Sequence, residues 1–177
     1  MTGVWHRRTT VPAAHATVYD RPDGRYVTTW ARSTVGLWLE TATFVVVPPT
    51  ADDATLAETV FALVGADAEL VGHPARDEWS ARRRETVGPI LRHARARSWR
   101  AFLAPALLVT VSRTGSTWRV APEQRHATRL DVFETITEET IELPECTLPA
   151  LATALGQALR AAERAEAEHL ARRLRRT

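Results

Sequence analysis

The sequence predicts an α+β fold: a single domain in which a largely antiparallel sheet packs with two main helices and a C-terminal helical extension. The length of 177 residues favours one domain over two. Several β-rich runs are separated by short turns, which is typical of hairpins. These runs precede, separate and follow two amphipathic stretches instead of alternating with them, and this order favours α+β over repeated βαβ units.

The first part of the chain is expected to be β-structure after a flexible lead-in. Residues 1–14 have no periodicity, which is typical of a poorly ordered terminus. Three strands are then predicted: His15–Tyr19, Arg25–Ala31 and Leu37–Val47. The first two are joined by a turn at Arg21–Gly24, where a proline presets φ and Gly24 can take a positive φ. A Pro-Pro pair ends the third run.

The middle of the chain is expected to hold one clear helix and some shorter elements. An Asp-Asp pair can cap the helix, and apolar residues keep helical spacing from Leu56 to about Gly65. The helical spacing of apolar residues is lost between Gly72 and Gly88, and this predicts a polar, basic connection. Two short elements are expected after it: a helix over Ile90–Ala96, begun by a proline, and a capped turn at Ser98–Leu103.

The C-terminal part carries the clearest β signal and the longest helix. Alternating apolar residues predict strands at Leu107–Val111 and from Trp118 to Pro122, joined by a turn at Arg113–Ser116. A further strand is expected at Glu139–Leu143. Thr147 can cap a helix whose leucine stripe runs through Leu155, and whose pattern extends to Leu174.

These elements divide the chain into a lead-in (1–14), an α+β domain (15–162) and a basic helical tail (163–177). In the domain, the two helices around Leu56–Val64 and Leu148–Leu159 should pack on the sheet, with Leu155 and Val109 almost fully buried.

Composition excludes several kinds of chemistry. All 23 basic residues are arginine, and the chain has neither lysine nor asparagine, as a GC-rich codon bias would produce. A P-loop lysine, a Schiff-base lysine and a Ser-x-x-Lys hydrolase are therefore excluded. The single cysteine, Cys146, excludes an internal disulfide framework, and the neighbouring carboxylate of Glu145 would raise its pKa rather than activate it.

No motif predicts an active site. The six histidines include no pair at i, i+4 spacing, and neither Cys-x-x-Cys nor a glycine-rich dinucleotide loop occurs. We therefore expect no catalysis, no metal and no cofactor. No window is long and apolar enough to span a membrane, and no cleavable signal is apparent, so we expect a soluble cytoplasmic protein.

Charge is distributed in strongly signed stretches. Residues 131–145 contain six acids and no arginine, whereas residues 76–100 contain eight arginines and three acids. The acids that we take as candidate partner-binding residues are Asp131, Glu134, Glu138, Glu139 and Glu142. They can be the solvated edge of a sheet, or a docking surface for a basic partner. The basic stretches, including the tail, suggest nucleic-acid contact or ordinary solvated helices with i, i+4 ion pairs.

Several hydrophobic spacings resemble those of a known family. They include Ser98-Trp99-x-x-Phe102 with the strands that follow it, the helix around Leu56, and the helix Leu151-Ala152-x-x-Leu155-Gly156. Over about residues 26–162 the chain resembles immunity proteins of contact-dependent growth inhibition systems, in the subgroup that neutralises ribonuclease-like toxins. Glu58, where glycine is common in the family, and the basic extension after Arg160 depart from this pattern.

This resemblance implies an immunity protein that binds a cognate toxin domain and blocks its active site, with no catalysis of its own. The toxin would be a basic nuclease, because its substrate is a polyanion, and an acidic surface would imitate that substrate. The alternative is a nucleic-acid-binding regulator that uses the arginine-rich segments. Contact with a membrane is not expected, and the sequence leaves the oligomeric state and the identity of the toxin open.

Overall fold

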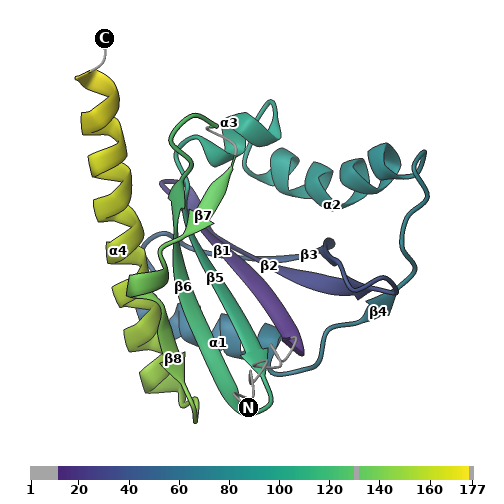
Figure 1. Cartoon of the computed structure of the whole chain (residues 1–177), viewed down its shortest axis with the longest axis horizontal. Helices are drawn as coiled ribbons and strands as arrows, with labels where there is room; N and C mark the ends of the chain where they lie inside the picture. The colour runs from purple at the N-terminus through teal and green to yellow at the C-terminus, as the bar shows by residue number, and fades with distance from the viewer. Residues whose placement is uncertain (1–11, 130–131, 176–177) are drawn as a thin grey trace, which may run out of the picture.

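The computed structural model describes residues 12–129 and 132–175 and is an α+β domain built on one eight-stranded sheet (Figure 1). The strands are β1 (Ala14–Arg21), β2 (Gly24–Ser33), β3 (Trp38–Val47), β4 (Leu70–Val71), β5 (Leu107–Thr114), β6 (Thr117–Arg125), β7 (Phe133–Thr135) and β8 (Ile141–Leu143). The helices are α1 (Asp53–Val64), α2 (Trp79–His93), α3 (Trp99–Leu103), the 3₁₀ turn η1 (Thr137–Glu139) and α4 (Leu148–Leu174).

The sheet is antiparallel apart from one short pair, which confirms the predicted fold class. Its main order is β3-β2-β1-β5-β6-β7, with β4 beside β2 and β8 beside β6. Among the strand pairs of the described residues, only β2–β4 is parallel. The strands β3 and β7 therefore lie at opposite edges, and β1 and β5, which are far apart in the sequence, pair in the middle.

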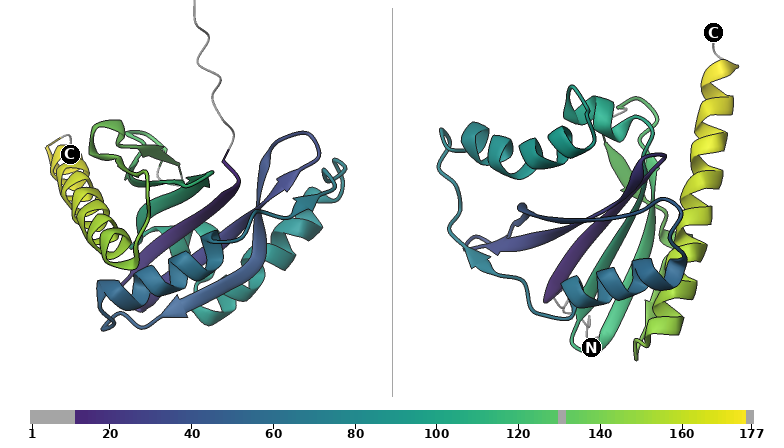
Figure 2. Two further views of the ribbon diagram at one scale, coloured as in Figure 1. Left: turned by 90° about the horizontal axis from the view of Figure 1, so that it is seen from below. Right: turned by 180° about the vertical axis from the view of Figure 1, so that it is seen from behind.

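One face of the sheet carries the larger core, under α1 and α4 (Figure 2). Leu56 and Val60 of α1 and Leu151 and Leu155 of α4 are fully buried against the apolar side chains of the strands. Val109, at the centre of β5, is also fully buried. Both helices start as the sequence predicts: side chains of Asp52 and Thr147 accept hydrogen bonds from backbone N–H groups three residues later.

The other face carries a smaller, aromatic core under α2 and α3. Tyr19, Tyr26 and Phe102 form edge-on ring contacts there, with centroids 5.2 and 5.4 Å from Phe102. Ile90 of α2 packs against this cluster and is fully buried. The helix α2 lies over β3, and a cavity remains between this helix and the β2–β3 half of the sheet.

The predicted basic connection over Gly72–Gly88 is wrong in its second half, because α2 begins at Trp79 and continues through Pro89 to His93. Only Thr86, Val87 and Ile90 of this helix are buried. An amphipathic pattern with so narrow an apolar side is hard to recognise in a sequence. The proline, read as a helix start, lies instead inside the helix.

The predicted end of a strand at Pro122 is also wrong, because β6 runs on to Arg125. β8 pairs with residues 118–120 of β6, and β7 pairs with residues 123–125. Pro122 thus lies in the gap between two short edge strands, where its missing N–H interrupts no ladder. The strand expected at Glu139–Leu143 likewise begins only at Ile141, after η1.

Two buried arginines hold the C-terminal end of the short helix α3. Arg125 Nη2 donates to the carbonyls of Leu103, Ala104 and Ala106, at 2.7, 2.9 and 3.1 Å. From the other side, Arg21 donates to the carbonyl of Phe102 and stacks over its ring. Carbonyl groups that the helix leaves without an internal partner are satisfied in this way.

Arg125 also fixes α4, which continues without a break past residue 162. Its Nε lies 3.0 and 2.9 Å from the two carboxylate oxygens of Glu166, and its guanidinium stacks over Phe133 at 4.7 Å. His169, one turn further on, is buried. At least the part of the predicted tail up to His169 thus packs on the domain.

Leu155→Ala should lower the free energy of unfolding by about 2–5 kcal/mol, because it removes a fully buried side chain from the centre of the larger core. Urea unfolding measures the difference. Leu170→Ala is the matched control on the same helix, since Leu170 is 48% exposed, and should change stability by less than about 1 kcal/mol. Equal effects of the two substitutions would contradict the packing described.

Arg125→Met should be destabilising by about 3–5 kcal/mol, since it leaves the Glu166 carboxylate and three carbonyls without their donor. Adding Glu166→Gln should restore part of the loss, because the stranded charge is removed. The control is Arg164→Met, whose ion pair with Glu139 is exposed and should contribute at most about 1 kcal/mol. A tolerated Arg125→Met would show that α3 and α4 are held by packing alone.

Candidate functional site

The candidate acids lie along the segment that joins β6 to α4. Glu134 is on β7, Glu138 and Glu139 are on η1, and Glu142 is on β8; all four are exposed. Asp131 lies outside the described residues. The structure thus spreads these side chains over three short elements at one edge of the sheet, instead of along one strand.

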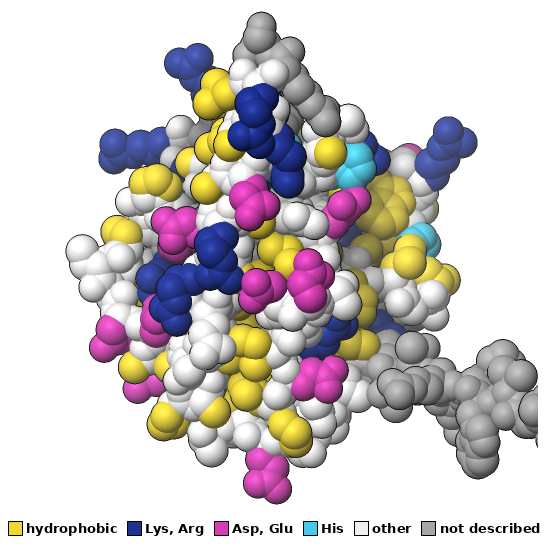
Figure 3. Space-filling view, turned by 60° about the vertical axis from the view of Figure 1, so that its left-hand side comes forward, with side chains coloured by type: hydrophobic (Ala, Val, Ile, Leu, Met, Phe, Trp, Pro, Cys, Tyr) yellow, Lys and Arg dark blue, Asp and Glu magenta, His cyan; other side chains and the backbone are white. Residues whose placement is uncertain are grey.

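The helix α4 brings arginines to this acidic segment. Arg164 Nη2 lies 3.1 Å from Glu139 Oε1, and both residues line a hollow of about 270 Å³ together with Glu138 and Arg160. Figure 3 looks onto the side of the molecule that carries α4 and shows acidic and arginine side chains interleaved. Residues 131–145 contain no arginine, but α4 places Arg160 and Arg164 beside them.

The acids therefore differ in how available they are. Glu139 is paired with Arg164, and Glu134 Oε1 lies 3.5 Å from His126 Nε2. Within the part of the chain that the structure describes, Glu138 and Glu142 form no ion pair. These two exposed carboxylates can accept a partner's cation without first losing one from this chain.

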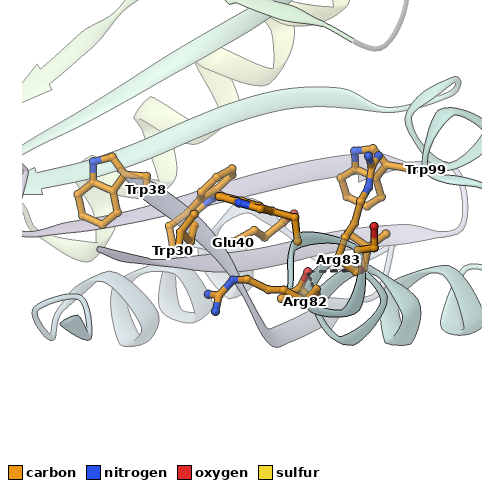
Figure 4. Close-up of a pocket in the computed structure, with 11 residues that line it drawn as sticks. Trp30, Trp38, Glu40, Arg82, Arg83 and Trp99 are labelled. Carbon is orange, nitrogen blue, oxygen red and sulfur yellow. Dashed lines mark hydrogen bonds between the residues drawn. The ribbon is translucent and has the colours of Figure 1, made fainter. Parts of the chain in front are cut away.

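A second candidate site is a cavity of about 460 Å³ between α2 and the β2–β3 half of the sheet, which we call the tryptophan cavity (Figure 4). Its lining combines four tryptophans with one carboxylate and two arginines: Trp30, Trp38, Trp79, Trp99, Glu40, Arg82 and Arg83. The aromatic side chains come from β2, β3, α2 and α3, so only the folded chain assembles them.

The strand side of the tryptophan cavity is held by hydrogen bonds and ring contacts. Trp30 Nε1 donates to Thr17 Oγ1 at 3.0 Å, and the Tyr19 hydroxyl donates to Glu40 Oε1 at 3.1 Å. The His15 ring contacts Trp30 edge-on, with centroids 5.4 Å apart, and lies 5.6 Å from Trp38. Burial raises the pKa of Glu40 and lowers that of His15 to about 4.

A wide irregularity in the β2–β3 ladder places Glu40 in the cavity. The register passes from Thr28 opposite Phe44 to Trp30 opposite Glu40, so three residues of β3 face the single residue Thr29. Thr29 and Thr41 join their hydroxyls across this bulge at 2.8 Å. Phe44 and Glu40 both lie on the α2 side, where they contact the aromatic core and the cavity.

The helix side of the cavity supplies positive charge. Arg82 and Arg83 project from α2 toward the strand-borne tryptophans and toward Trp99, respectively (Figure 4). No carboxylate of the described residues forms an ion pair with either arginine. The sequence marks these arginines as a basic run, but the tryptophans and Glu40 that complete the site were not predicted. The signals that the sequence holds for them are its six tryptophans and the i, i+2 spacing of Trp38 and Glu40.

In residues 12–129 and 132–175, no three His, Cys, Asp or Glu side chains are grouped so that they could hold a metal ion. Among the helices described, none has the length and apolar character needed to cross a membrane.

Solved structures that share this fold include the following two proteins. A protein of unknown function from Neisseria meningitidis superposes with a TM-score of 0.70 at 13% identity, over 91% of this chain and 99% of that one. A chain of the CdiA-CT/CdiI toxin and immunity complex from Yersinia pseudotuberculosis superposes with a TM-score of 0.64 at 15% identity, over 83% of this chain and 95% of that one.

At these identities the two structures show a shared fold. The second one agrees with the resemblance to immunity proteins of contact-dependent growth inhibition that the sequence suggests. No protein-family model matches the chain, and no curated protein matches it.

His15 should make stability depend on pH below neutrality. Its pKa falls from 6.5 to about 4 on folding, so the unfolded chain takes up a proton first as the pH drops. The contribution of neutral, buried His15 to the free energy of unfolding is fully present above about pH 6.5. It is lost as the pH falls toward 4, by up to about 3 kcal/mol. Urea unfolding of His15→Gln should lack this part of the pH dependence, whereas His73→Gln, at an exposed histidine, should retain it. Parallel curves for all three proteins would refute the burial of a neutral imidazole.

Proposed function

We propose that this chain is an immunity protein that binds a toxin domain and neutralises it, acting in the cytoplasm and without catalysis of its own. The observation that carries the proposal is the fold shared with a chain of a toxin and immunity complex, over 83% of the present chain. The independent sequence resemblance to immunity proteins supports it. Because fold alone does not determine function, the proposal also needs a surface suited to a toxin.

The acidic segment supplies such a surface for a basic partner. Four exposed carboxylates, on β7, η1 and β8, lie at one edge of the sheet. A nuclease is cationic around its active site because it binds a polyanion. An acidic inhibitor surface accelerates encounter with such a site and opposes wrong partners. We therefore propose a basic nuclease as the toxin, with Asp131, Glu134, Glu138, Glu139 and Glu142 at the contact.

The ion pairs within the chain lead us to expect unequal contributions from these acids. At Glu139 a toxin cation would replace Arg164. The gain in binding free energy is then only the difference between the new ion pair and the one that is lost. At Glu138 and Glu142 a toxin cation would form a new pair. We expect the two unpaired acids to dominate the electrostatic part of binding, since exchange of one exposed pair for another changes the free energy little.

The proposal is tested with the toxin domain encoded by the reading frame adjacent to this gene. The purified toxin and this chain should form a stable complex in size-exclusion chromatography, and co-expression should restore growth to cells that produce the toxin. A folded chain that neither binds that toxin nor protects the cells would contradict the proposal.

Glu138→Gln and Glu142→Gln should each slow association with the toxin about two- to tenfold at low salt, with the effect fading at high salt. Glu139→Gln should have a smaller effect, because Arg164 already neutralises this side chain. Stopped-flow measurements at low and high ionic strength give the rates.

The matched control is Glu58→Gln, which removes an exposed acid from α1, away from the acidic segment. If all four variants associate at the wild-type rate at low salt, the acids are only a solvated edge of the sheet and the interface lies elsewhere.

A further inference from the structure

We propose that the tryptophan cavity binds a nucleoside phosphate, with a guanine base between the tryptophan rings and the phosphate on Arg83, at the Trp99 end of the cavity. This site lies on the opposite edge of the sheet from the acidic segment, and the inference does not depend on the proposed immunity function. The cavity volume of about 460 Å³ lies within the range of small-molecule sites, roughly 300–1,000 Å³.

The tryptophans favour a planar ligand. Trp30, Trp38, Trp79 and Trp99 all contribute to the lining, and Trp79 is 40% exposed even though it is a large aromatic side chain. Every nucleic acid base has a π-face that stacks on such rings. Trp30 is held in place by its hydrogen bond to Thr17, so its ring is already oriented in the unliganded chain.

The two signs of charge in the cavity exclude simpler ligands. A cation would be attracted by Glu40 and the aromatic rings but repelled by Arg82 and Arg83. A small anion or an acidic peptide would be attracted by the arginines but repelled by Glu40. A nucleotide can satisfy both the carboxylate and the arginines. Its base edge offers hydrogen-bond donors to Glu40, and its phosphate carries the negative charge that the arginines attract.

The geometry at Glu40 favours guanine among the bases. Tyr19 donates to Oε1 at 3.1 Å and orients the carboxylate, whose oxygens each have more than one acceptor site. A carboxylate only accepts hydrogen bonds and can receive two parallel ones. Guanine presents two adjacent donors, N1–H and the N2 amino group, on its Watson–Crick edge. Adenine presents an acceptor beside its amino group and would leave one carboxylate oxygen facing a lone pair.

Arg83 suits the phosphate because a guanidinium binds phosphate oxygens through paired N–H donors. The side chains of Arg82 and Arg83 point to different ends of the cavity, so a phosphate at the Trp99 end contacts Arg83, while Arg82 adds positive charge at the other end. Arg83 also lines an adjoining hollow of about 460 Å³ with Arg84 and Arg92. This second hollow offers room and charge for a further phosphate, as in a diphosphate or the 5′ end of a single strand.

Intrinsic tryptophan fluorescence and calorimetry on the full chain test the inference, with GMP, GDP, AMP, guanosine and inorganic phosphate as ligands. GMP should bind at least about tenfold more tightly than AMP, because each correct base contact discriminates by such a factor. Inorganic phosphate and guanosine should both bind more weakly than GMP. A 5′-phosphorylated oligoribonucleotide beginning with guanine distinguishes a strand end from a free nucleotide as the source of the ligand.

Substitutions test which residues contact the phosphate and which contact the base. Arg82→Gln with Arg83→Gln should weaken GMP binding about tenfold or more and leave guanosine unaffected, whereas Arg97→Gln, an exposed arginine outside the cavity, should change neither. Glu40→Gln should abolish the preference for GMP over AMP. Because the arginines lie at the rim, their variants test the site even if Glu40→Gln fails to fold.

Three results would overturn the inference: no saturable binding of any nucleotide or of the oligonucleotide at millimolar concentration, equal binding of GMP and inorganic phosphate, or GMP binding that the arginine variants leave unchanged.

Discussion

The buried guanidinium of Arg125 is the contact on which the arrangement of the helices depends. One side chain binds the end of α3, the start of the connection to β5, and the carboxylate of Glu166 in α4. It thereby fixes α3, which carries Trp99 of the tryptophan cavity, and the part of α4 that lies beside η1. A lysine has three donors on one atom and could not reach all of these partners. An arginine-only composition, whatever its origin, suits this structural role.

The sequence predicts most of the strands and both helices of the larger core, because those elements have regular apolar periods and clear caps. It does not predict α2, whose apolar side is narrow and whose proline looks like a boundary. The same limit applies to the sites. Contiguous charges such as Glu138 and Glu139 are visible in a sequence, but the pairing of Glu139 with Arg164 joins residues 25 positions apart. The tryptophan cavity joins four elements, so no local pattern could show it.

The fold keeps surfaces of opposite charge apart. The acidic segment lies at the β7–β8 edge of the sheet, and the arginines of α2 lie over the β3 edge, with β2, β1, β5 and β6 between them. At physiological salt the Debye length is about 8 Å, so charges separated by several strands of about 4.8 Å spacing are largely screened from each other. A molecule that is nearly neutral as a whole, with a net charge of +2, can thus offer two independent electrostatic surfaces.

The bulge between β2 and β3 has a consequence for how this chain tolerates insertions and deletions. It adds two residues to β3 relative to β2, and an even number preserves the alternation of side chains along a strand. Deleting one residue from Thr41–Thr43 would turn Glu40 and Trp38 to the α1 side, whereas losing two would only shorten the bulge. Related chains of different length in this segment should therefore differ by pairs of residues. Alignments at identities near 15% can use this parity rule to place their gaps.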